Sequence, residues 1–223
     1  MSTVSIIGDC HLARVYEHHP ESDTKIKFWG TAGLKVFGID FEELSKINKI
    51  SSGTEIGNKD PVEFKEIEGS DLIIIWLGYV DIRQNLPKYK NSDIIVKKYV
   101  ESAISFFKNK NIIFVEPLPQ FDKMYLKYDG ISPEYTYEER VNQNNEFNFY
   151  LSKYAKDAGL KDPISQKLIF DYLGVDFLDS KVLRKIAPHP VDSLSEEYNK
   201  KLYDFFISLI VGQVGLEPTI TEL

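Results

Sequence analysis

The only cysteine of this 223-residue chain, Cys10, stands in the stretch Gly8-Asp9-Cys10-His11, directly after the apolar run Val4–Ile7. A thiolate is a strong nucleophile, and its pKa falls when it lies at a helix N-terminus or beside an imidazolium. His189, between two prolines near the end of the chain, is the imidazole that we expect to act as its base. A pair of this kind can take an acyl group onto sulfur and pass it on to a second acceptor.

Each of the other predicted strands is also followed by residues that could belong to a site. In an open parallel sheet, ligands bind beyond the carboxyl ends of the strands, where the strand order reverses. We therefore expect the residues that follow the strands to meet at one edge of the sheet, together with those just before the last helix. They are His11 beside Cys10, Gly33 after the second strand, Gly78, Asp81 and Arg83 after the third, and Asp192 close to His189.

The elements that must position these residues alternate between strand and helix. Continuous apolar runs are typical of buried parallel strands, and an alternating run predicts an edge strand. The buried strands are Val4–Ile7, Leu72–Leu77 and Ile112–Val115, and the edge strand is Lys25–Trp29. Apolar residues at three-to-four spacing predict the helices Phe41–Ile47, Ser92–Lys108, Tyr137–Ala158 (with Gly159 as its stop) and Glu196–Ile210. We expect an α/β fold of three α/β/α layers around a flavodoxin-like parallel sheet of four or five strands.

Composition and charge favour a single globular domain and argue against a nucleic-acid-binding protein. With 43% hydrophobic and 27% charged residues, the chain is expected to form one domain over residues 1–211. A C-terminal tail over residues 212–223 should follow, because two glycines and a proline interrupt the last helix. The formal net charge of −7 argues against nucleic-acid binding, which needs a basic face.

The expected location is the cytoplasm. No apolar run approaches the roughly 20 residues that span a bilayer, so no membrane partner is predicted. The N-terminus lacks the basic flank and apolar core of a secretory signal. A single cysteine forms no internal disulfide, which favours a reducing compartment. The oligomeric state is left open.

The order of the motifs resembles that of the SGNH hydrolases, also called GDSL-type esterases. In that family a Gly-Asp-Ser block after the first strand carries the nucleophilic serine, and a glycine follows the second strand. A Gly-x-Asn-Asp block follows the third strand, and an Asp-x-x-His pair precedes the last helix. The resemblance runs from Gly8 to His189 and depends on the order and spacing of the motifs. His11 and Arg83 fit a subgroup with Gly-Asp-Ser-His and Gly-x-x-Asp-x-Arg that is often found near glycan and capsule genes.

Three positions depart from the family pattern: Cys10 replaces the serine, Val80 the asparagine and Ile186 the aspartate. A cysteine depends less on a positioned base than a serine does, so Cys10 and His189 could work without the aspartate. Asp192 or a backbone carbonyl is then left to orient the ring. Without the asparagine, the oxyanion is left to backbone amides near Cys10 and Gly33. One lost side-chain donor typically costs about a hundred- to thousandfold in rate.

The resemblance implies an esterase or acyltransferase that acts on an acylated carbohydrate, for example an acetylated one. Cys10 would be its nucleophile and His189 its base, and the substrate would be a small-molecule or glycan ester. No cofactor is implied. The pair His18-His19 has no second cluster of ligands near it in the sequence, so no metal site is predicted.

Simpler interpretations exist for the same residues. Cys10 could be a small buried hydrophobe, and His189 could stand in a rigid surface turn. Asp81 and Arg83 could form a structural ion pair that ties the third strand to its neighbours, and Asp9 could accept amide hydrogen bonds in the turn after the first strand. These interpretations favour a catalytically inactive protein of the same fold, which binds a glycan or a protein partner in the same cleft.

Overall fold

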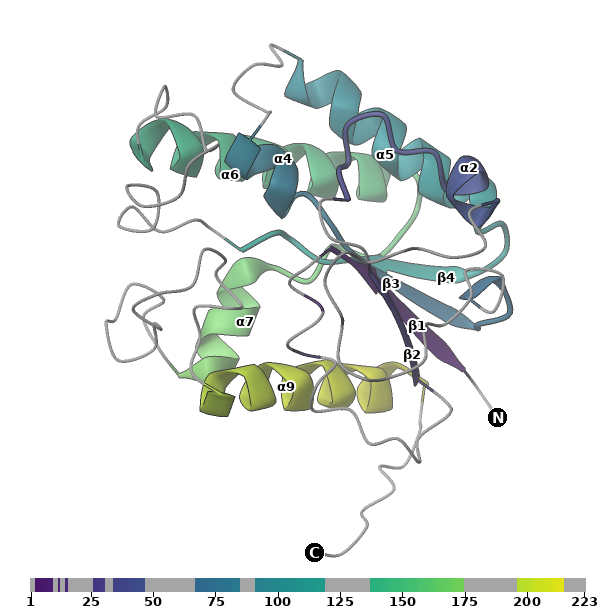
Figure 1. Ribbon diagram of the computed structural model, residues 1–223, viewed down its shortest axis with the longest axis vertical. Helices are drawn as coiled ribbons and strands as arrows, with labels where there is room; N and C mark the ends of the chain where they lie inside the picture. Colours follow the sequence, from purple (N-terminus) through teal and green to yellow (C-terminus); the bar gives the residue numbers. More distant parts are fainter. Residues whose placement is uncertain are drawn as a thin grey trace, which may run out of the picture.

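A parallel sheet lies between two layers of helices (Figure 1). The computed structural model describes residues 3–9, 12, 15, 26–30, 34–46, 67–84, 91–118, 137–174 and 196–214. Within them lie the strands β1 (Val4–Gly8), β2 (Ile26–Gly30), β3 (Leu72–Trp76) and β4 (Asn111–Phe114). Their order in the sheet is β2-β1-β3-β4, and every neighbouring pair is parallel. The flavodoxin-like order and the edge position of the second strand are thereby confirmed.

A single parallel bridge extends the sheet beyond β4, between Val115 and Ile164. The amide of Glu116 donates to the carbonyl of Ile164 at 2.9 Å, and the amide of Ile164 donates to the carbonyl of Phe114 at 2.9 Å. The chain around Ile164 therefore occupies the place of a fifth strand. This agrees with the predicted sheet of four or five strands.

Four of the described helices were predicted from apolar spacing. They are α2 (Phe41–Ser45), α5 (Ser92–Phe106), α6 (Tyr137–Asp157) and α9 (Glu196–Val214). Two more, α4 (Tyr79–Gln84) and α7 (Gln166–Leu173), lie outside the predicted set. The second of these, α7, buries Ile169 and Leu173 on one face and carries a cap at each end. Ser165 accepts the amide of Leu168, and Gly174 ends the helix with φ of 66°.

The last helix runs further than the sequence suggested. The tail was expected to begin at Gly212, but α9 continues through this glycine to Val214. A glycine inside a helix costs only about 1 kcal/mol relative to alanine and does not by itself end the helix. The helix therefore extends past residue 211, and the assignment of one domain to residues 1–211 stays a prediction. In the described part of the chain, no helix has the length and apolar character of a membrane span.

Helices cover both faces of the sheet (Figure 1). One face packs Val4 and Ile6 against Leu202 and Phe206 of α9. The other face packs Ile73 and Ile75 against α2, α5 and α6. Because both faces are buried, successive residues of a strand are mostly apolar, which explains the continuous runs, and the buried Ser5 of β1 is satisfied by the Ser70 hydroxyl at 2.7 Å. The predicted three-layer α/β/α architecture is confirmed.

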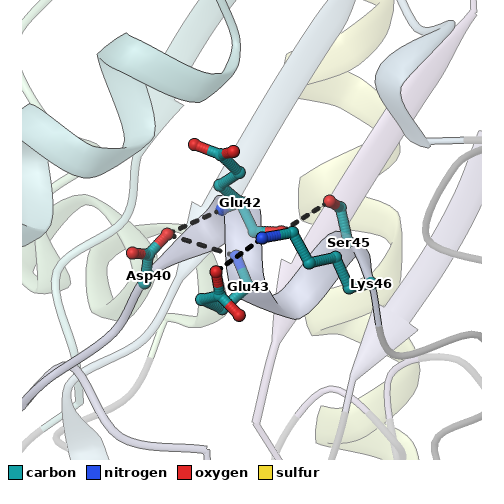
Figure 2. Close-up of polar contacts among 5 residues, drawn as sticks. All are labelled: Asp40, Glu42, Glu43, Ser45 and Lys46. Atoms are coloured by element: carbon teal, nitrogen blue, oxygen red, sulfur yellow. Dashed lines mark hydrogen bonds and ion pairs between the residues drawn. The ribbon is translucent and has the colours of Figure 1, made fainter.

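The loop that leaves β2 is held at its far end by the first turn of α2 (Figure 2). Asp40 Oδ1 accepts the amides of Glu42 at 2.9 Å and Glu43 at 3.2 Å. Lys46 Nζ lies 2.6 Å from Glu43 Oε1, and Ser45 Oγ donates to the Glu42 carbonyl at 2.7 Å. An N-cap of this kind contributes about 1 kcal/mol, and here it fixes where the loop ends and the helix begins.

Candidate functional site

The carboxyl ends of β1, β2 and β3 lie side by side. In the sheet register Gly8 faces Gly30 on one side and Trp76 on the other. A Cβ atom on Gly30 would lie 3.1 Å from the Gly8 carbonyl oxygen and 3.3 Å from that of Asp9. The absence of side chains thus lets the first two strand ends approach closely. The residues that follow all three strands start from this one edge of the sheet.

Several predicted site residues lie outside the described part of the chain, namely Cys10, His11, Gly33, His189 and Asp192. The same holds for the side chain of Arg83, although its backbone belongs to α4. Just after Cys10, Leu12 and Val15 are helical and buried, and the Leu12 amide donates to the Asp9 carbonyl at 3.1 Å. The helix start expected at Cys10 stays a prediction. The approach of Cys10 to His189 stays a prediction.

Gly78 forms the turn between β3 and α4, and the backbone there requires a glycine. Its φ is 117°, a conformation that residues with a Cβ rarely adopt. A Cβ atom at this position would lie 2.6 Å from Cζ of Phe147 on α6. Its carbonyl accepts the Ile82 amide at 3.0 Å, which closes the first turn of α4. Gly78 therefore fixes the direction in which the chain leaves β3.

Asp81, on α4, joins the exits of two strands. It is fully buried, with 0% of its surface exposed. Its Oδ2 accepts the amide of Val36 at 2.7 Å, and its Oδ1 accepts the amide of Phe37 at 2.9 Å. Each carboxylate oxygen thus holds one amide of the loop after β2. The suggested ion pair with Arg83 stays a prediction, and helix geometry speaks against it because residues two apart point in different directions.

The environment of Asp81 keeps its proton affinity high. Burial raises the pKa of this carboxyl to about 6, and the amides of Val36 and Phe37 and the charge of Lys35 offset only part of that rise. At neutral pH the group is therefore ionised, which is the form that accepts both amides. Around pH 6 it takes up a proton.

Two further acidic groups are buried near Asp81. Asp9 follows β1 and is 1% exposed, and Tyr99 on α5 is 1% exposed. Burial raises the pKa of the Tyr99 hydroxyl well above its ordinary value, and the charges of Asp81 and Asp9 raise it further. Among the residues that the structure describes, this hydroxyl has no hydrogen-bond partner. The carboxyl edge therefore holds two buried groups whose pKa values are raised, Asp81 and Tyr99. The structural role suggested for Asp9 stays a prediction.

Sequence reasoning missed a polar cluster beyond the end of β4. Glu116 Oε2 accepts the amide of Gln166 at 2.9 Å, and Gln166 Oε1 accepts Nδ2 of Asn144 at 3.0 Å. Burial raises the pKa of Glu116, and the Gln166 amide lowers it in part. Asn144 and Asn148 are both buried on the inner face of α6. Their spacing places two amides in an otherwise apolar stripe, which is the signal that could have found this cluster.

A metal centre needs several ligands in one place. Within the described ranges, no three His, Cys, Asp or Glu side chains gather in a way that could hold an ion. The acidic groups near the strand ends, Asp9 and Asp81, are both buried.

Comparison with known proteins finds solved structures of similar fold. No family model matches the chain, and no curated protein matches its sequence. A proposed platelet activating factor from Streptococcus pneumoniae aligns with a TM-score of 0.58 and 16% identity, over 94% of this chain and 84% of that one. The lipase/acylhydrolase from Enterococcus faecalis aligns with a TM-score of 0.55 and 12% identity, over 96% and 97%. A proposed SGNH hydrolase from Slackia heliotrinireducens aligns with a TM-score of 0.51 and 8% identity, over 94% and 98%.

The chain has the fold of the SGNH hydrolases. The alignments cover 94 to 96% of this chain. At the position of the asparagine of that fold family's third block, Val80 is 1% exposed and has no polar side-chain atom. A side-chain donor to an oxyanion is therefore absent at position 80. At identities of 8 to 16%, these alignments establish the fold alone.

Proposed function

We propose that the protein is an SGNH-type esterase or acyltransferase that acts on an acylated carbohydrate. Cys10 is the nucleophile and His189 the base. The observation that supports this most is the carboxyl edge of the sheet. There the exit of β1, two residues before Cys10, lies beside the exits of β2 and β3. The shared fold with a lipase/acylhydrolase supports the same class of reaction.

In the proposed reaction, the Cys10 thiolate attacks the carbonyl carbon of the ester and forms a carbon–sulfur bond. The carbonyl electrons move onto oxygen, and backbone amides near Cys10 and Gly33 stabilise the oxyanion. Collapse of this intermediate breaks the carbon–oxygen bond, and the alcohol leaves with the proton held by His189. His189 then deprotonates a water or a sugar hydroxyl, which takes the acyl group from sulfur and restores the thiol.

Other predicted residues have supporting roles. Because Ile186 cannot accept a hydrogen bond, Asp192 or a backbone carbonyl orients the His189 ring. His11 and Arg83 contact the glycan part of the substrate. The choice of a carbohydrate rests on the likeness of these two residues to the Gly-Asp-Ser-His subgroup with its downstream arginine.

Trapping of the acyl intermediate tests the reaction. The protein is incubated with p-nitrophenyl acetate, and intact mass and peptide mapping follow. Wild type should gain one acetyl group on Cys10, Cys10→Ala should gain none, and Cys10→Ser should acylate more slowly. Absence of any adduct, together with equal ester turnover in all three proteins, would contradict the proposal.

A second candidate is a binding protein that has this fold without the chemistry. The observation that favours it is Val80, a buried apolar residue where the family has its asparagine. Ile186, at the position of the family's aspartate, points the same way. Such a protein would bind acetylated and deacetylated oligosaccharides without consuming either. Calorimetric titration with both forms, combined with the mass measurement, separates binding alone from acyl transfer.

A further inference from the structure

We propose that a groove along residues 34–44, between the exit of β2 and α2, binds a neutral stretch of a carbohydrate chain. The groove has a volume of about 380 Å³. Ligand sites commonly measure about 300 to 1,000 Å³, so it is large enough to hold a sugar unit. The class of ligand rests on the proposed function, whereas the groove contains none of the residues to which acyl transfer is assigned.

The loop that forms the groove is fixed to the core near both of its ends. Asp81 on α4 accepts the amides of Val36 at 2.7 Å and Phe37 at 2.9 Å, close to the exit of β3. Further on, the Phe41 amide donates to Ser102 Oγ on α5 at 3.2 Å, and the Phe41 ring is buried. The loop therefore has a defined course from the carboxyl edge to α2 (Figure 1). A site that is formed before binding loses little conformational freedom when the ligand arrives.

The middle of the groove is apolar. Phe37 keeps 46% of its surface exposed. Leu34, Ile39 and Leu44 line the same groove and pack in part against the core. Gly38 leaves open space beside them, because nothing lies within 4 Å of the place where its Cβ would be. An exposed aromatic ring beside open space can stack on the C–H face of a sugar ring.

The polar groups of the groove carry charges of both signs. Lys35 lies toward β2, and the exposed carboxylates of Asp40 and Glu43 lie at the start of α2. Asp40 Oδ1 caps α2, and Glu43 Oε1 pairs with Lys46 (Figure 2). Among the residues with a described position, the second oxygen of each carboxylate accepts no hydrogen bond, and Lys35 forms no ion pair. These groups are left for a ligand.

This mixture of charges indicates the class of ligand. A phosphate group would be attracted by Lys35 but repelled by Asp40 and Glu43, and a basic peptide would meet the reverse. A hydroxyl group is both donor and acceptor, so it can donate to a carboxylate and accept from an ammonium group. A neutral sugar has hydroxyls around its edge and C–H groups on its face, which matches the charged ends and the apolar middle of the groove. The groove thus extends the substrate site to sugars beyond the ester.

An array of immobilised ligands tests this binding without any acyl transfer. It carries neutral chains of hexoses and N-acetylhexosamines, phosphorylated chains, and basic peptides. Wild type should bind neutral chains in preference to the other two classes, and calorimetric titration with a bound chain then gives the affinity. Absence of binding to every neutral chain, or equal or stronger binding of the phosphorylated chains or basic peptides, would overturn the inference.

Phe37→Ala removes the aromatic ring and keeps the amide that Asp81 accepts. It should weaken binding roughly tenfold or more, since truncation of an aromatic anchor commonly costs that much. Phe37→Tyr keeps the ring and should stay within about threefold of wild type. The matched control is Phe149→Ala, because Phe149 is 64% exposed on α6, outside the groove. It should bind within about twofold of wild type. Equal affinities of Phe37→Ala and Phe149→Ala would overturn the inference.

Asp40→Asn tests the carboxylate without loss of the helix cap. Asparagine caps a helix about as well as aspartate, so the amides of Glu42 and Glu43 keep their acceptor. The variant loses a charged acceptor and should weaken binding about threefold or more. If Phe37→Ala does not fold, an unchanged affinity in Asp40→Asn would overturn the inference.

Failure of the proposed function is distinguishable from failure of the groove. A protein that binds neutral chains through Phe37 but is never acylated at Cys10 keeps the groove and contradicts the reaction. A protein that is acylated at Cys10 but binds no neutral chain keeps the reaction and overturns the groove.

Discussion

An aspartate stands at each end of β3, and each accepts backbone amides, but the two ends are built differently. At the entry of the strand, Asp71 is exposed and accepts the single amide of Thr3 at 2.8 Å. Beyond the exit, Asp81 is fully buried and accepts the amides of Val36 and Phe37 at 2.7 and 2.9 Å. At the exposed end, water can accept the Thr3 amide in place of the Asp71 carboxylate. At the buried end, the amides of Val36 and Phe37 depend on the Asp81 carboxylate as their acceptor.

The difference extends to the neighbours of each aspartate. At the entry end the buried hydroxyls of Ser5 and Ser70 satisfy each other at 2.7 Å. At the exit end the Tyr99 hydroxyl lacks a hydrogen-bond partner within the described residues, and the Asp81 carboxyl keeps a pKa near 6. Buried groups with shifted pKa values gather at functional sites more often than elsewhere. The contrast is in line with the proposal that the function lies at the carboxyl edge.

The largest effect on stability is expected from Gly78→Ala. The new Cβ would meet the Phe147 ring at 2.6 Å, on a backbone with φ of 117°. Strain and overpacking together should cost about 3 kcal/mol or more of unfolding free energy in urea denaturation. Gly159→Ala is the matched control, because φ is 72° and nothing lies within 4 Å of a Cβ there. It should cost about 1 kcal/mol. Equal losses would show that the exit of β3 is not specially constrained.

A smaller, pH-dependent effect is expected from Asp81→Asn. The folded pKa of Asp81 is raised from 3.8 to about 6, so its contribution to stability is fully present below the unfolded pKa and is lost as the pH rises through about 6. Relative to Asp81→Asn, wild type should lose up to about 3 kcal/mol of unfolding free energy between pH 4 and pH 7.5. Denaturation curves at several pH values measure this, and parallel pH profiles of the two proteins would contradict it.

The smallest effect is expected from Asp71→Asn at the amino edge. Its single hydrogen bond is exposed, so water can take the place of the lost carboxylate oxygen. The cost should stay below about 1 kcal/mol at every pH. Urea denaturation beside wild type checks this. A loss as large as that of Asp81→Asn would remove the contrast between the two ends of β3.

Much of the fold could be predicted because both faces of the sheet are covered. Continuous apolar runs marked β1, β3 and β4, and alternation marked the edge strand β2. Short elements escaped the same reasoning. The helix α4 was not predicted, and α9 continues through Gly212, where the sequence indicated its end.

The sequence predicted that the strand exits meet at one edge, but it did not predict which groups contact one another there. The strand exits meet at one edge, as the order of the motifs implied. The partners of Asp81 could not be predicted, because they are backbone amides 45 and 44 residues earlier in the chain and leave no mark in the sequence. Asn144 and Asn148 stood in an apolar stripe and could have been noticed. The pairing of Cys10 with His189 stays a prediction.

The pH dependence of Cys10 alkylation tests the central claim most directly, which is that His189 activates this thiol at the carboxyl edge. Iodoacetamide rates are measured for wild type and for His189→Ala, with His18→Ala as the matched control. In wild type the thiol should react with a midpoint well below about pH 8.5, the ordinary range of a free cysteine. His189→Ala should raise that midpoint by about one pH unit or more, and His18→Ala should leave it unchanged. A wild-type midpoint at or above the ordinary range, unaffected by His189→Ala, would contradict the account.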